Sequence, residues 1–191
     1  MYLGNVQIMK MINFIRFILI MVAINPYISN AEMVAEESIE NKWTVDIITE
    51  NSVHATVNGQ VIYGDSLHVR IIKDHCDKGN LLNFVYTYSN HPEIEQLKDH
   101  YVTSNFMGSK LIVKVLFSSP FLMGHRATVD MGWLDIEKLK IMLSQENPII
   151  MKYIDSPEIK ITDYFDITEN SWSNDGLSEA LDRASNMCKR L

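Results

Sequence analysis

Apolar side chains at every second position recur along most of this chain. The alternation is clear in residues 43–47, 67–71 and 125–131. Successive side chains of a strand point to opposite faces, so a period of two indicates strands with one face buried. Runs of branched and aromatic residues predict further strands at 81–88, 101–107, 110–117, 149–154 and 159–167. The chain is therefore constrained to a largely antiparallel sheet.

Two glycine-containing turns predict where consecutive strands form hairpins. Asn58-Gly59 is the pair that tolerates positive φ at both centres of a type I′ turn. A second hairpin is predicted over Phe106–Lys110, with Gly108-Ser109 as its turn.

Helical spacing is confined to three segments. Pro92 suits the first turn of a short helix, and Asp135 can cap a helix whose Ile136, Leu139 and Leu143 share one face. At the end of the chain, apolar residues fall at helical spacing over 177–188, after a predicted cap at Ser173 or Asn174. We predict one α+β domain over 32–191, a mostly antiparallel sheet or sandwich closed by a C-terminal α-helix.

The N-terminus has the order of a secretory signal peptide. Lys10 and Arg16 precede an apolar run over 17–24, and Ser29-x-Ala31 offers the small side chains that a signal peptidase needs. The run is far shorter than the roughly 20 residues that span a bilayer. We expect residues 1–31 to be removed and the mature protein to be periplasmic or extracellular, without a membrane span.

The charge balance narrows the choice of partner. Removing residues 1–31 takes away two basic residues and no acidic one, which leaves 15 basic against 24 acidic residues and a formal charge of −9. Nucleic acid and anionic membranes would be repelled at long range. The expected partner is a protein or a small ligand, not a nucleic acid.

Cys76 and Cys188 are the only cysteines. In an oxidising compartment a pair of this kind predicts one disulfide. The spacing is not Cys-x-x-Cys, so a thioredoxin-like redox pair is not indicated, and a zinc site would need further ligands beyond His75.

No sequence motif identifies catalytic or metal chemistry. The six histidines lack paired-ligand spacing, so we interpret them as scattered surface imidazoles and expect no metal or cofactor. A nucleophile elbow, a phosphate loop and a dinucleotide fingerprint are also missing from the sequence.

One constellation is a candidate site. Gly124-His125-Arg126, with Asp130 and the nearby Trp133, can present an imidazole and a guanidinium to an anion, with Asp130 orienting either. The competing interpretation is that strand alternation alone places Arg126 and Asp130 on one solvated face. The sequence thus favours an exported, non-enzymatic binding or interaction module. The alternative is a small hydrolase-like enzyme built on His125, Arg126 and Asp130.

Overall fold

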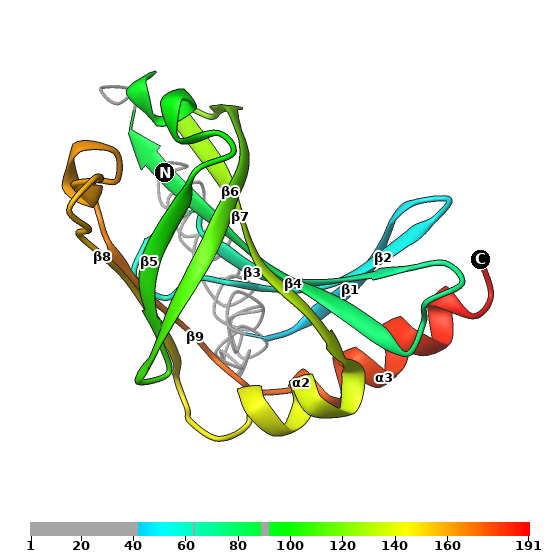
Figure 1. The fold of residues 1–191 in the computed structure, drawn as a ribbon. Helices are drawn as coiled ribbons and strands as arrows, with labels where there is room; N and C mark the ends of the chain where they lie inside the picture. The colour runs from blue at the N-terminus through cyan, green and yellow to red at the C-terminus, as the bar shows by residue number, and fades with distance from the viewer. Residues whose placement is uncertain (1–41, 63, 89–91) are drawn as a thin grey trace, which may run out of the picture. The chain divides into compact units, whose positions relative to one another are not determined.

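The computed structural model describes residues 42–62, 64–88 and 92–191, and nine strands of this part form a single sheet (Figure 1). The predicted signal peptide and its cleavage site lie outside these residues. The strands are β1 (Thr44–Thr49), β2 (Ser52–Asn58), β3 (Ser66–Ile72), β4 (Lys78–Tyr88), β5 (Tyr101–Phe106), β6 (Ser109–Phe121), β7 (Gly124–Asp135), β8 (Ile149–Ile154) and β9 (Glu169–Trp172).

The sheet is antiparallel throughout and strongly curled. Its order is β1-β2-β3-β4-β7-β6-β5-β8-β9, and every neighbouring pair is antiparallel. Helix α2 (Ile136–Leu143) lies between β7 and β8, and α3 (Leu177–Cys188) follows β9 and packs against β1, β2 and β3. This confirms the predicted mostly antiparallel sheet with a C-terminal helix. The two separate sheets of a sandwich are not seen in the described part of the chain.

Several local predictions are confirmed. In α2 the buried residues are Ile136, Leu139 and Leu143, the face that the spacing predicted. The predicted β5–β6 hairpin is present, but its turn lies one residue earlier than the predicted Gly108-Ser109. Met107 and Gly108 are the central residues, with the φ values of 49° and 74° that a type I′ turn requires, and Ser109 pairs with Phe106. In α3 the apolar stripe is buried as predicted, although the helix begins after Gly176 and not at Ser173 or Asn174.

The prediction of a tight turn at Asn58-Gly59 was wrong. Strands β2 and β3 do pair, but residues 59–65 form a longer connection between them. Gly59 serves a close contact instead, because a Cβ there would lie 2.5 Å from Nδ2 of Asn170. A glycine can therefore mark close packing as well as a turn.

The predicted strand over 159–167 was also wrong. This segment contains a short 3₁₀ helix, η4 (Ile161–Asp163), and the strand comes later, as β9. Asp155 accepts a hydrogen bond from the Ile161 N–H at 2.8 Å, and the Ile161 carbonyl accepts from Tyr164 and Phe165. These local bonds use backbone groups that a strand ladder would need.

Asp65 connects two strands that are far apart in the curled sheet. Its carboxylate accepts hydrogen bonds from the Tyr86 N–H on β4 at 2.6 Å and from Nδ2 of Asn170 on β9 at 2.8 Å. The connection between β2 and β3 also bonds β9 directly, since the Gln60 N–H donates to the Ser171 carbonyl at 2.9 Å. Burial raises the pKa of Asp65 to about 7. This buried side chain thereby joins β9, at one end of the sheet, to β4, an inner strand.

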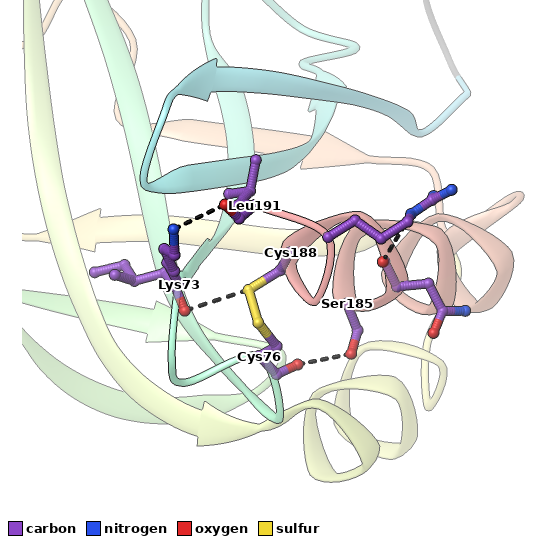
Figure 2. Close-up of a disulfide and its surroundings, with 8 residues drawn as sticks. Lys73, Cys76, Ser185, Cys188 and Leu191 are labelled. Atoms are coloured by element: carbon purple, nitrogen blue, oxygen red, sulfur yellow. Dashed lines mark hydrogen bonds between the residues drawn. A yellow bond between two sulfur atoms is a disulfide. The ribbon is translucent and has the colours of Figure 1, made fainter.

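The C-terminal helix is fixed by the disulfide. Cys76 and Cys188 are bonded, with their Cα atoms 5.6 Å apart, which confirms the predicted pairing. Ser185 Oγ donates to the Cys76 carbonyl at 2.6 Å and Lys73 Nζ donates to the Leu191 carbonyl at 2.7 Å (Figure 2). A disulfide is compatible with export from the cytoplasm. None of the helices within the described ranges has the length and apolarity to cross a membrane.

We expect Cys188→Ser to lower the free energy of unfolding by about 4 to 5 kcal/mol, because the bond closes a long loop in the unfolded chain. The loop spans 112 residues. Urea unfolding with and without a reducing agent measures this. Equal midpoints under both conditions would contradict the anchoring role of the disulfide.

Candidate functional site

Strand β7 changes its partners halfway along its length. From Gly124 to Asp130 it pairs with β6 on one side and β4 on the other. The pairing with β6 ends at Lys114 and Asp130; beyond it β7 pairs only with β4, and β6 only with β5. Figure 1 shows the two strands separating toward α2. The sheet is therefore split along part of this seam.

The split begins at a bulge that Asp130 holds in place. Met131 is the extra residue of the bulge. Gly132 follows with φ 106°, a backbone conformation that residues other than glycine rarely adopt. The Asp130 carboxylate accepts hydrogen bonds from the Gly132 N–H at 2.9 Å and from Nδ2 of the fully buried Asn80 at 2.7 Å. These bonds turn the rest of β7 away from β6.

The space between the separated strands is an apolar cleft of about 340 Å³. Met107, Met131 and Met142 reach it from the β5–β6 turn, β7 and α2, and Leu111 and Trp133 add to its lining. Flexible methionines suit surfaces that accept varied apolar groups. The size and lining are those of a small binding site.

Trp133 is the exposed tryptophan of the site. Its side chain is 43% exposed, whereas Trp43 and Trp172 are buried. The guanidinium of Arg70 lies 5.7 Å from the centre of the Trp133 ring and donates to Asn80 Oδ1 at 3.0 Å. An exposed indole beside an apolar cleft is typical of a binding surface.

Lys110 is the charged group of the cleft. No acidic residue lines the cleft. Among the described residues, Lys110 has no carboxylate within ion-pair distance, whereas the neighbouring Lys114 pairs with Asp99 at 2.7 Å. The cleft therefore presents one unpaired cation.

The three residues of the predicted site do not all lie on the same face of the sheet. Alternation along β7 places Arg126 and Asp130 on one face of the sheet, whereas His125 lies on the other, with the buried Ala127 and Val129. Asp130 stands at the start of the cleft, as described above. His125 has a buried Nδ1 without a hydrogen-bond partner in the described ranges. That these three residues bind a ligand stays a prediction.

Arg126 is stacked between two rings. Its guanidinium lies 4.8 Å from the Phe84 ring centre and 4.1 Å from that of Phe121. Burial lowers the pKa of Arg126. Within the described part of the chain, no carboxylate pairs with it.

The interpretation of the histidines as surface residues was wrong for His54 and His68. They lie on adjacent strands with their Nδ1 atoms 3.4 Å apart, and His68 also bonds Thr56 and Ser66. Burial lowers the pKa of His54 to about 4 and that of His68 to about 3, so both are neutral at pH 7. The described residues contain no cluster of three His, Cys, Asp or Glu side chains able to hold a metal.

Comparison of the chain with protein-family models, curated proteins and solved structures found no match. The site must therefore be interpreted from its own residues. Sequence reasoning noted Trp133 and Asp130 but missed Lys110 and the three methionines, which come together only through the β5–β6 hairpin and α2. Gly132, which breaks the alternation of β7, was the available signal of a bulge.

We expect Asp130→Ala to lower the free energy of unfolding by about 1 to 3 kcal/mol, because Asn80 Nδ2 and the Gly132 N–H lose their acceptor. Asp130→Asn retains Oδ1 as an acceptor and should lose less. Glu169→Ala is the control, since that exposed carboxylate pairs only with the exposed Lys152 among the described residues. Urea unfolding measures all three variants, and equal losses in all of them would contradict the role given to Asp130.

Proposed function

We propose that this protein is an exported, non-enzymatic interaction module whose binding site is the cleft between β6 and β7. The single observation that carries the proposal is the split in an otherwise continuous sheet, which leaves an apolar cleft lined by Met107, Met131, Met142 and Trp133. An antiparallel sheet is ordinarily stabilised by continuous pairing. A seam held open by a specific bulge is typical of a functional feature.

The chemistry of the cleft supports binding in preference to catalysis. Its lining contains one ionisable side chain, Lys110, and no carboxylate, imidazole or thiol. General acid–base and nucleophilic catalysis need such groups within reach of one another. The hydrolase-like alternative needs His125, Arg126 and Asp130 to act together, and His125 lies on the other face of the sheet from the other two.

An extracytoplasmic site of action is supported by two independent features. The sequence of residues 1–31 has the order of a signal peptide. The disulfide between Cys76 and Cys188 belongs to an oxidising compartment.

We expect the uncharged apolar dye Nile red to bind the folded protein in the cleft. Met142→Glu should weaken this binding by at least about tenfold, because it places a carboxylate against the apolar lining. Ile141→Glu is the matched control, since Ile141 lies on the same helix but is exposed and lines no part of the cleft. Fluorescence titration measures the two dissociation constants.

Ser109→Trp is a second cleft variant, which blocks the rim by bulk and introduces no charge. It should also weaken dye binding. Equal dye affinity in the cleft variants and in Ile141→Glu, or no dye binding to the folded protein, would contradict the proposal.

A further inference from the structure

The split leaves one edge of β6 without a partner strand. Phe106 and Ser109 flank the two-residue turn and form a hydrogen-bonded pair, so Leu111 and Val113 also bond β5. By the same alternation, the N–H and C=O groups of Lys110 and Ile112 point away from β5. Lys114 points the same way and meets Asp130 of β7, but Lys110 and Ile112 lie beyond that pairing.

These backbone groups favour a peptide as the occupant of the cleft. A free strand edge is a template for another extended chain, which supplies N–H and C=O groups in matching order. An acyl chain would fill the apolar space but would leave the backbone groups of Lys110 and Ile112 unmatched. Ile112 itself is 65% exposed, so the edge is reachable from solvent.

The charge of the cleft indicates which peptide segments it would favour. The mature chain is acidic as a whole, but the cleft has Lys110 as its unpaired cation and no acidic lining residue. At physiological salt, charges farther away than about 8 Å are largely screened, so Lys110 acts on a bound segment mainly through close contact. A partner segment with a carboxylate next to its apolar residues is complementary to this arrangement.

We infer that the cleft takes up an extended apolar peptide segment of a partner protein, which pairs as an added strand with β6 at Lys110 and Ile112 and places a carboxylate beside Lys110. This inference rests on the proposed function and specifies its ligand. Alternate apolar side chains of the peptide enter the space lined by Leu111, Met131 and Met142.

The probe is a set of six-residue peptides, blocked at both ends, in which Val, Leu or Met alternates with Thr and the last residue is Glu. Displacement of Nile red measures their affinities. The tightest peptide should bind at least about tenfold more strongly than its counterpart ending in Lys. Lys110→Glu should reverse this preference, whereas Lys98→Glu, at an exposed lysine beyond the cleft lining, should leave it unchanged.

Backbone pairing has its own test. N-methylation of one alternate set of peptide nitrogens should weaken binding by at least about tenfold, and methylation of the other set should be tolerated. On the protein, Ile112→Pro removes an edge N–H that β5 does not use and should weaken binding similarly.

Three results would overturn the inference. If dodecanoate displaces the dye and no peptide does, the cleft binds acyl chains, and the proposed function stands without this ligand. If both methylated sets bind as tightly as the parent peptide, no strand is added. If the protein forms dimers that Ile112→Pro abolishes, the edge is covered by a second copy of the chain.

Discussion

The bonds made by the Asp130 carboxylate decide where β7 stops pairing with β6, and the remainder of the site follows from that point. Gly132 and Asn80 both donate to this carboxylate, and together they hold the bulge that redirects β7. The redirected strand carries Trp133 to the rim and leads directly into α2, which brings Met142 to the cleft. The β5–β6 hairpin continues without β7, paired with β8 on its other side, and supplies Lys110 and Met107.

Two other links keep the sheet in the shape that this split requires. Asp65 joins β4 to β9 through one buried carboxylate, which holds the curled sheet near closure. The disulfide fixes α3 beside the turn that follows β3, and α3 also contacts α2. Because these links hold the sheet together elsewhere, β6 and β7 can separate while the hydrophobic core stays packed.

The sequence predicted the parts of this fold that depend on local patterns. Period-two alternation and runs of branched and aromatic residues together identified most strands, helical spacing identified α2 and α3, and the cysteine pair was predicted from its compartment. The errors had two different causes. Gly59 is needed for a long-range contact with Asn170, whereas local hydrogen bonds, among them that from the Ile161 N–H to Asp155, occupy the backbone near Ile161. The cleft was not predicted because its lining comes from separate elements whose meeting depends on the register of β7 after the bulge.

The open edge of β6 is the central claim of this account, and amide hydrogen exchange of the unliganded protein tests it most directly. The amides of Leu111 and Val113 bond β5 and should exchange slowly. Those of Lys110 and Ile112 face the cleft and should exchange at least about a hundredfold faster. Equal protection of all four amides would mean that another strand already covers this edge, and would contradict the account.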